Sequence, residues 1–334
     1  MLRPLLFATA LATTTLATTT VPVAAQSISA NDKALGAKAN PELLAQFGGR
    51  YTGPQAAYVA QVGKRVAVQS GLSNAQGDFT VALLDSPVEN AFAIPGGYIY
   101  VTRQLLALMN SEAELASVMG HEVGHVAARH SASRNQRATI GGVLAAVVGA
   151  AAGNSAAGQL VGTAARSGAQ LYVLKYGRDQ EYAADGLGVK YITAAGYDPY
   201  AAADMLAQLD AQSQLQAEVG GRGGQQVPTW ASTHPNSAER VRRAAALAKA
   251  TGKPLTDPPQ DTAFLRRLDG LAYDEKGSGK RIRIVTVKRG DTIDSLSRQM
   301  AYDTLQRERF TTLNAIEEDA QLTPGRLVKI VTKG

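Results

Sequence analysis

The sequence predicts a mostly helical α+β fold, followed by a small separate module at the C-terminus. Apolar residues recur at helical spacing in several segments between residues 54 and 250, whereas 79–84 and 97–102 read as strands. The segment 276–280 marks the boundary before the last module. With 334 residues, 45% of them hydrophobic, the chain can build one sizeable domain and a smaller one.

The first 25 residues are expected to be a secretory signal peptide outside the fold. Arg3 supplies a positive charge, residues 5–20 are apolar and threonine-rich, and Val23-Ala24-Ala25 offers small side chains before a cleavage site. A membrane anchor is the alternative interpretation, but the stretch is short. The chain has no cysteine and so forms no disulfide, and we expect an exported protein of the bacterial periplasm.

The main domain, residues 26–275, is expected to alternate helices with two strands. Residues 54–70 form the first helix, and Pro95-Gly96 is a turn before the second strand. A long helix starts at Ser111, because Ser111 and Glu114 have the spacing of a capping box and no proline follows until well past residue 133. Later helices are expected at 178–191, 198–216 and 237–250, and residues 251–259 form a linker.

Residues 140–165 form an unusual stretch rich in Gly, Ala and Val, with no charge before Arg166. Its length nearly spans a bilayer, but Asn154, Ser155 and Gln159 reduce its hydrophobic gain. We therefore expect a helical hairpin with small-residue packing at a membrane surface or a subunit interface.

A metal site is predicted by the string His121-Glu122-Val123-Gly124-His125, which contains two of the four histidines in the chain. Residues four apart lie on one face of a helix, so both imidazoles can bind one ion. Zinc accepts imidazole nitrogen and keeps an open position in catalytic sites. Glu122 then lies where it can take a proton from water. Gly120 and Gly124 suggest close approach by another backbone, with loose packing as the alternative.

Two histidines leave zinc short of a ligand, and Glu181-Tyr182-Ala183-Ala184-Asp185 offers a third. On a helix that crosses the first one, Glu181 can bind the metal while Asp185, four residues on, holds a ligand imidazole from behind. The sequence therefore predicts one zinc ion per chain, bound by His121, His125 and Glu181.

These motifs resemble those of the HtpX/Oma-type and CaaX-protease-type gluzincin metallopeptidases. The likeness covers roughly residues 41–250 and rests on Asn90-Ala91-Phe92-Ala93-Ile94-Pro95-Gly96-Gly97, His121 to His125, Glu181 to Asp185, and Ser232-Thr233-His234-Pro235 through Arg240. It implies a zincin-type domain with Glu122 as general base. It also implies a substrate groove along the strand at 90–98, formed by Asn90, Ala91, Phe92, Ala93, Gly96, Gly97 and Tyr98. Membrane members carry leucine-rich spans that this chain lacks, so it is similar to a soluble periplasmic branch, without prenyl-protein processing.

His234 is open to two functional interpretations. The family pattern places His234 and Arg240 near the metal, where they would stabilise the anion that forms during catalysis. Alternatively, His234 occupies the open metal position and keeps a resting enzyme inactive. A third interpretation is an exposed loop histidine beside a proline. His130 is expected to be solvated among Arg129 and Arg134.

Residues 276–334 are similar to a LysM module, a strand–helix–helix–strand unit associated with N-acetylglucosamine polymers such as peptidoglycan. The two strand segments, at 285–287 and 327–330, match that pattern, whereas 301–312 is longer and more charged than the pattern. From Gly277 onward, eleven Lys/Arg stand against seven Asp/Glu, so +4 of the net charge of +6 lies in the tail. This favours contact with an anionic surface or cell-wall polymer, whereas export disfavours nucleic acid as a partner.

The function expected from these features is a zinc endopeptidase of the cell envelope that cleaves misfolded or unassembled proteins. Two other classes stay open at this point. One is a chaperone-like assembly factor with a closed site, and the other is a cell-wall hydrolase directed by the tail. The complete His121, His125 and Glu181 set with Glu122 favours the enzyme.

Overall fold

The protein is represented by a computed structural model that describes residues 26–130, 176–220, 230, 234, 238–256 and 259–334. The expected signal peptide and the small-residue stretch at 140–165 lie outside these residues, as do Ser232, Thr233 and Pro235. Among the described helices, none combines the length and the apolar character needed to cross a membrane.

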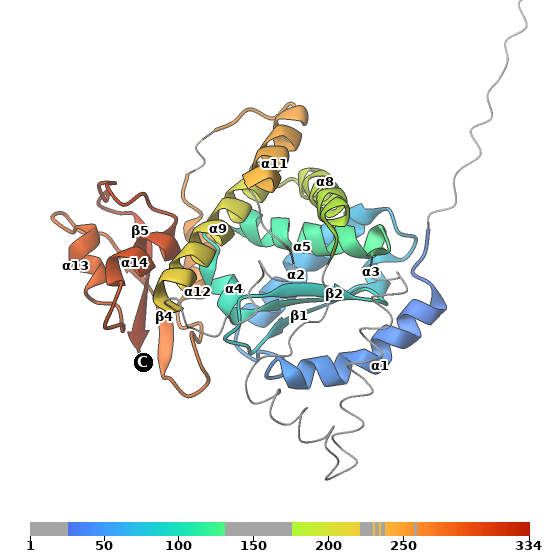
Figure 1. Ribbon diagram of the computed structural model, residues 1–334, viewed down its shortest axis with the longest axis horizontal. Coiled ribbons are helices and arrows are strands. Elements are labelled where there is room, and N and C mark those ends of the chain that lie inside the picture. The colour runs from blue at the N-terminus through green and yellow to red at the C-terminus, as the bar shows by residue number, and fades with distance from the viewer. Residues whose placement is uncertain (1–25, 131–175, 221–229, 231–233, 235–237, 257–258) are drawn as a thin grey trace, which may run out of the picture.

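Helices make up most of the larger domain (Figure 1). Their bounds are α1 Ala30–Gln46, α2 Gln55–Ala67 with the 3₁₀ turn η1 Val68–Ser70, α3 Ala75–Asp78, α4 Arg103–Leu108, α5 Glu112–Ala127, α8 Arg178–Ala194, α9 Ala201–Gly220, α11 Ala238–Ala250 and α12 Thr262–Leu268. The expected helices α2, α5, α8, α9 and α11 are confirmed, whereas α1, α4 and α12 were not anticipated.

A three-stranded mixed sheet lies at the centre of this domain. Its strands β1 (Thr80–Leu84), β2 (Ala91–Ile94) and β3 (Tyr98–Thr102) are ordered β1-β3-β2. β1 runs parallel to β3, with Thr80 opposite Tyr98, and β2 runs antiparallel to β3. The strands expected at 79–84 and 97–102 are therefore confirmed as β1 and β3, and the strand that the resemblance implies at 90–98 is present as the shorter β2 at one edge of the sheet.

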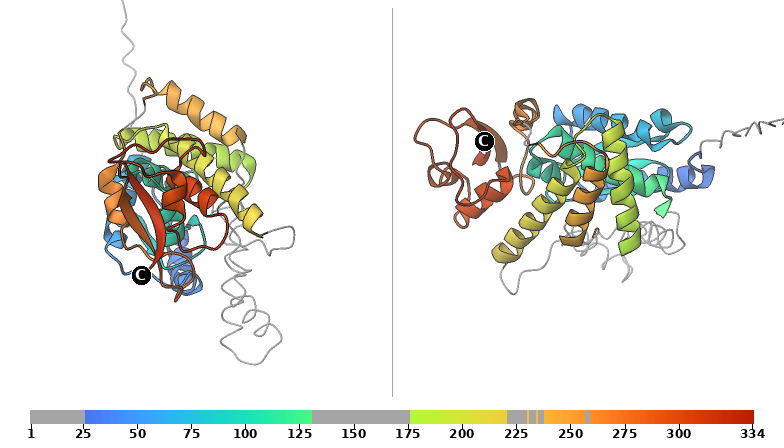
Figure 2. Two further views of the ribbon diagram at one scale, coloured as in Figure 1. Left: turned by 90° about the vertical axis from the view of Figure 1, so that its left-hand side faces the viewer. Right: turned by 90° about the horizontal axis from the view of Figure 1, so that it is seen from above.

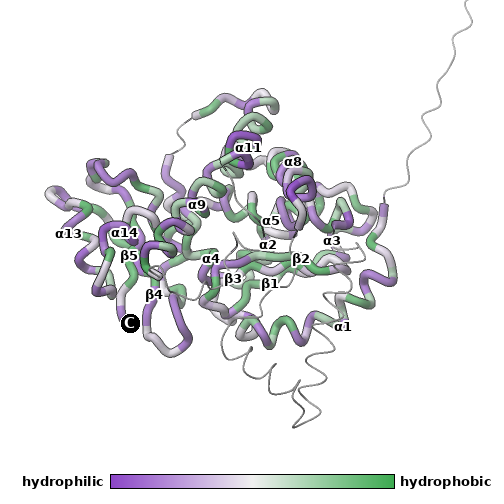
Figure 3. The backbone as a smooth tube through the Cα atoms, viewed as in Figure 1, coloured by the Kyte–Doolittle hydropathy of each residue, from purple (hydrophilic) through white to green (hydrophobic). Residues whose placement is uncertain are grey.

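Both faces of the sheet are buried, and consecutive residues alternate between two cores, as the two-residue period of a strand requires. Val81 and Leu83 of β1 face the core shared with α2 and α5, whereas Ala82 and Leu84 face α1. The tube coloured by hydropathy accordingly shows hydrophobic strands between α1 on one side and α2 and α5 on the other (Figure 3). Burial on both faces explains why the strands read as nearly continuous apolar runs.

Helix α5 begins where the sequence predicts. The Ser111 hydroxyl accepts a hydrogen bond from the Glu114 amide at 3.1 Å. The Glu114 carboxylate accepts from the amide of Asn110 at 2.7 Å, one residue earlier than in a standard capping box. The helix ends at Ala127, which is shorter than expected.

Helices α5 and α8 cross with their backbones in contact. A Cβ atom on Gly120 would lie 3.0 Å from the Gly188 carbonyl oxygen, and one on Gly124 would lie 2.9 Å from that of Ala184. The expected close approach of another backbone at Gly120 and Gly124 is therefore confirmed. The crossing brings the acidic side chains of α8 to the histidines of α5.

The C-terminal module has the expected order of strand, helix, helix and strand. It consists of β4 (Lys280–Thr286), α13 (Ile293–Ser297), α14 (Gln306–Asn314) and β5 (Leu327–Lys333), with β4 antiparallel to β5. Figure 2 shows the module at one end of the molecule, away from α1.

A buried lysine joins the module to the larger domain. Lys329 of β5 is fully buried, and its ammonium donates to the carbonyl oxygens of Ala107, Leu108 and Met109 at 2.8, 3.0 and 2.8 Å. Burial lowers the pKa of Lys329, and the nearby Glu114 carboxylate opposes that shift. Three acceptors favour the charged form, because a neutral amine donates only two hydrogens. A cation at this place also suits the negative end of α4.

We predict that Lys329→Met destabilises the whole fold by roughly 3–5 kcal/mol, since it leaves Glu114 and three buried carbonyls without their cation. Lys333→Met is the matched control, because Lys333 lies on the same strand and is exposed. Denaturant unfolding of the two variants measures the difference. Equal stability of both would mean that the buried ammonium does not hold the module in place.

Candidate metal centre and active site

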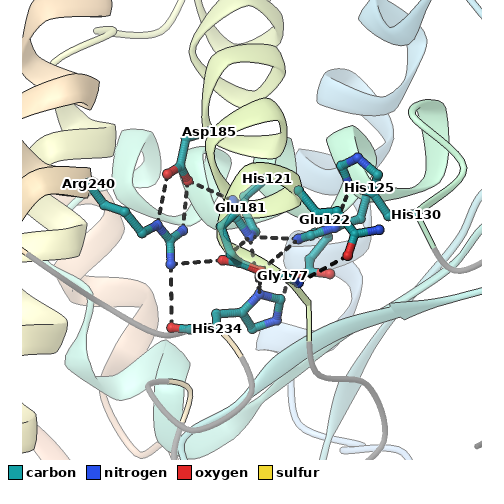
Figure 4. Close-up of polar contacts among 10 residues, drawn as sticks. His121, Glu122, His125, His130, Gly177, Glu181, Asp185, His234 and Arg240 are labelled. Carbon is teal, nitrogen blue, oxygen red and sulfur yellow. Dashed lines mark hydrogen bonds and ion pairs between the residues drawn. The ribbon is translucent and has the colours of Figure 1, made fainter. Parts of the chain in front are cut away.

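Three metal-binding side chains meet where α5 and α8 cross (Figure 4). His121 and His125 lie one turn apart on α5, and their Nε2 atoms are 3.0 Å from each other. Glu181 on α8 places one carboxylate oxygen 3.5 Å from His121 Nε2 and the other 3.5 Å from His125 Nε2. All three side chains are buried. The structure thus brings together the ligand set expected from the sequence.

His234 adds a fourth donor atom to this cluster. Its Nδ1 lies 3.0 Å from Glu181 Oε1 and 3.2 Å from His121 Nε2, and its side chain is fully buried. One ligand atom from each of the four residues lies within 4.8 Å of all the others. Ligands about 2.0–2.2 Å from a tetrahedral zinc ion are roughly 3.3–3.6 Å apart. The four donors therefore fit zinc, and the exposed-loop interpretation of His234 is wrong.

The protonation states of Glu181 and His125 also suit a metal. Burial by itself would raise the pKa of Glu181, but His234 and His125 lower it well below its usual value, so the carboxylate is ionised. Burial lowers the pKa of His125 well below its usual value, which keeps that imidazole neutral. A metal requires these forms of carboxylate and imidazole.

Asp185 and Arg240 hold the ligands from behind. Asp185 Oδ1 lies 2.9 Å from His121 Nδ1, which leaves Nε2 of that ring for the metal. Arg240 donates to both oxygens of Asp185 at 2.8 and 2.7 Å and forms an ion pair with Glu181 at 2.8 Å. Burial by itself would raise the pKa of Asp185, but Arg240 and His121 lower it to about 2.

The structure adds a second role for Arg240. The sequence suggested a guanidinium that stabilises charge on the substrate. The side chain is buried, and its contacts include Asp185, Glu181 and the His234 carbonyl. Arg240 therefore also positions the ligands.

Glu122 lies beside the metal-binding atoms. It is fully buried, and its carboxylate is 3.6 Å from His234 Nε2. Burial raises the pKa of Glu122, against opposing effects of His234 and His121. A raised pKa suits a group that must take up a proton and release it near neutral pH.

The expected groove residues divide between the two faces of the sheet. Ala91 and Ala93 of the edge strand β2 face the core shared with α5, and the Ala93 backbone is close enough to lower the pKa of Glu122. Phe92 faces α1 instead, and its ring centroid is 4.8 Å from that of Tyr100.

The remaining groove residues lie elsewhere. Tyr98 is on the central strand β3 and also packs on the α1 side. Gly96 and Gly97 form a turn with positive φ angles, 89° and 84°, packed against Asp32 and Asp78 respectively. Asn90 is fully buried at the entry to β2, where its amide donates to the Thr102 hydroxyl at 3.1 Å.

Sequence reasoning missed the aromatic side chains around the cluster. His130 is half-buried rather than fully solvated, and its Nδ1 lies 2.9 Å from His125 Nδ1. Tyr176 stacks on His125 with ring centroids 3.7 Å apart, and Trp230 stacks on His234 at 4.1 Å. Trp230 is the single tryptophan of the chain and lies four residues before His234. This spacing was the one signal in the sequence that could have placed Trp230 at the cluster.

Comparisons with known proteins agree with this geometry. Residues 54–248 match the model of Peptidase family M48. The mitochondrial metalloendopeptidase OMA1 of Schizosaccharomyces pombe is 32% identical over 215 residues, which cover 64% of this chain and 59% of that protein. The beta-barrel assembly-enhancing protease of Yersinia pestis is 28% identical over 232 residues (66% and 45%), and that of Escherichia coli strain K12 is 29% identical over 194 (55% and 37%). The chain spans less than two thirds of each of these relatives. The family match ends before the C-terminal module.

We predict one zinc ion per chain, which His121→Ala or Glu181→Ala should abolish because each removes a ligand. Asp179→Ala is the control for the acidic substitution, since Asp179 is exposed on the same helix. Elemental analysis after dialysis gives the metal content. A full complement of zinc in either ligand variant would contradict the assignment.

Proposed function

The chain belongs to Peptidase family M48, and on that premise we propose that it is a zinc-dependent endopeptidase of the bacterial cell envelope. This membership confirms the resemblance to the HtpX/Oma-type metallopeptidases that the motifs indicated. The observation that carries the proposal is the convergence of His121, His125 and Glu181 directly beside the carboxylate of Glu122. Such a set has the parts needed for metal-assisted hydrolysis of a peptide bond.

In this mechanism Glu122 moves the protons. A zinc ion held by His121, His125 and Glu181 would supply Lewis acidity toward the scissile carbonyl and the attacking water. Glu122 accepts a proton from that water and then delivers it to the nitrogen of the leaving amine, so the base is regenerated in one cycle. Burial of Glu122, which raises its pKa, brings the carboxylate closer to the basicity that both steps require.

The edge strand β2 is the proposed place for the substrate backbone. Among the strands that the structure describes, β2 pairs with β3 alone, and we propose that an extended peptide adds to its other side through main-chain hydrogen bonds. Ala93 lies on this strand next to Glu122. Recognition through backbone groups suits a protease that acts on unfolded segments of varied sequence.

The proposed substrates are unfolded or unassembled envelope proteins. Two of the relatives described above are named beta-barrel assembly-enhancing protease, and residues 1–25 resemble a signal peptide for export to the periplasm. Contact with a membrane surface through 140–165, and with peptidoglycan through the LysM-like module at 276–334, would place the enzyme near such substrates.

We propose further that His234 caps the metal in the resting enzyme. Its Nδ1 lies among the other ligand atoms and its Nε2 faces Glu122, which supports a cap that would fill the fourth metal position and approach the base. The same geometry supports the alternative function, a chaperone-like assembly factor whose site stays closed. Turnover of a protein substrate distinguishes the two functions.

Glu122→Gln should keep the fold and the zinc but abolish cleavage of an unfolded protein such as casein. The amide preserves the shape of the side chain and cannot take up the proton, a loss of about 10²–10⁴-fold. Glu218→Gln, an exposed change of the same kind, serves as control. Near-normal turnover by Glu122→Gln would refute the mechanism, whereas an inactive wild-type protein would favour the closed-site factor.

His234→Ala separates the resting cap from a role in stabilising charge during catalysis. Removing a cap raises the fraction of competent enzyme, so the apparent KM should fall and kcat/KM should rise with zinc retained. Removing a group that stabilises the transition state should instead lower kcat by about 10²–10³-fold. Steady-state kinetics with a fluorogenic peptide therefore gives opposite signs for the two roles.

A further inference from the structure

The indole of Trp230 covers one face of the His234 imidazole. The two ring centroids are 4.1 Å apart and the planes are inclined by only 20°, which is a stacked arrangement. The same indole lies against His121, with centroids 5.4 Å apart. Its side chain is 2% exposed, so its position is fixed by packing on every side. Trp230 thus contacts a metal ligand on α5 and the proposed cap at once.

The backbone of Trp230 is tied to the strand that leads into the groove. Its amide donates to the Glu89 carbonyl oxygen at 2.7 Å, and its own carbonyl oxygen accepts from the His234 amide at 2.8 Å. Glu89 immediately precedes Asn90 and the edge strand β2. The Glu89 carboxylate is in turn held by Gln212 and Gln216 of α9, at 2.6 and 2.8 Å. A chain of contacts therefore runs from α9 through Glu89 and Trp230 to His234.

Stacking fixes the plane of an imidazole but leaves its two nitrogens free to make contacts at the ring edge. In that plane His234 Nδ1 points at Glu181 and His121, and Nε2 points at Glu122. A tilt of the ring would move both nitrogens away from these partners. We propose that Trp230 is the positioning residue that holds His234 in the capping position. This inference rests on the proposed role of His234 as a cap.

The test uses the full-length protein loaded with cobalt, whose visible absorption reports the number and geometry of its ligands. His234→Ala should change that spectrum. Trp230→Leu, which keeps an apolar side chain but removes the stacking face, should change it in the same direction. Trp230→Phe, which restores an aromatic face, should return it toward the wild-type spectrum. Cobalt content should stay at one per chain in all variants, because His121, His125 and Glu181 are intact.

Kinetics supplies a second, independent readout. Loss of an aromatic contact should raise the ratio of uncapped to capped enzyme by about two- to tenfold. Trp230→Leu should therefore raise kcat/KM by the same factor through a lower apparent KM. The double variant Trp230→Leu/His234→Ala should behave like His234→Ala alone, since Trp230 acts through His234. Additive effects in the double variant would overturn the inference and indicate a general packing role.

The possible failures can be told apart. If His234→Ala alters the cobalt spectrum and Trp230→Leu does not, the positioning role is refuted while the cap stands. If His234→Ala leaves the spectrum unchanged, the cap and this inference both fall. Should Trp230→Leu not fold, the intrinsic emission of Trp230 in otherwise unaltered protein gives the answer, because it is the single tryptophan. His234→Ala should shift that emission, and unchanged emission would exclude the stack.

Discussion

The backbone contact between α5 and α8 is the constraint on which the site depends. Packed helices usually lie 8–10 Å apart, and glycine at the crossing lets them approach closely. Each helical glycine costs roughly 1 kcal/mol against alanine. The glycines of α5 lower helix stability, but they let α8 come close enough for Glu181 to reach His121 and His125. An added methyl on Gly124 would meet the Ala184 carbonyl at 2.9 Å and push the ligands apart.

Charge balance then explains why the buried acids tolerate each other. Glu122, Glu181 and Asp185 lie in one cluster, and Arg240 is the guanidinium that contacts two of them. Burial by itself would lower the pKa of His234, but Glu181 and Glu122 raise it, so its imidazolium offsets part of the negative charge when no metal is bound. With the neutral imidazoles that metal binding requires, three carboxylates and one guanidinium leave an excess of two negative charges, which a divalent cation would balance. Buried charges without such compensation are strongly destabilising. A bound divalent cation would therefore stabilise the cluster together with its hydrogen bonds.

The sequence was sufficient for those parts of the structure that depend on local spacing. Ser111 and Glu114 start α5 as their spacing indicates, and the spacing of four between His121 and His125 places both on one face. Asp185 reaches His121 as the helical repeat from Glu181 suggests. Helix α1 escaped notice because Pro41 lies inside it and its apolar residues form no clear stripe.

Contacts between segments distant along the chain could not be predicted from the sequence. The position of Arg240 depends on how α11 meets α8, and that of Phe92 depends on which face of β2 turns toward α5. His130 was misjudged because neighbouring arginines suggested solvent, whereas the turn after α5 directs its ring to His125. The position of Trp230 beside His234 could not be predicted, because Trp230 belongs to no periodic apolar pattern in the sequence.

Contacts with the C-terminal module also help to fix the position of the metal centre. Lys329 binds the carbonyls at the end of α4, and Asn110, only a few residues on, is bonded by Glu114 of α5. Arg103 of α4 donates to the carbonyl oxygens of Ala272 and Asp274, just before β4. The module is therefore fixed to the start of the helix that carries His121 and His125. These contacts therefore hold the module at a fixed distance from the metal centre.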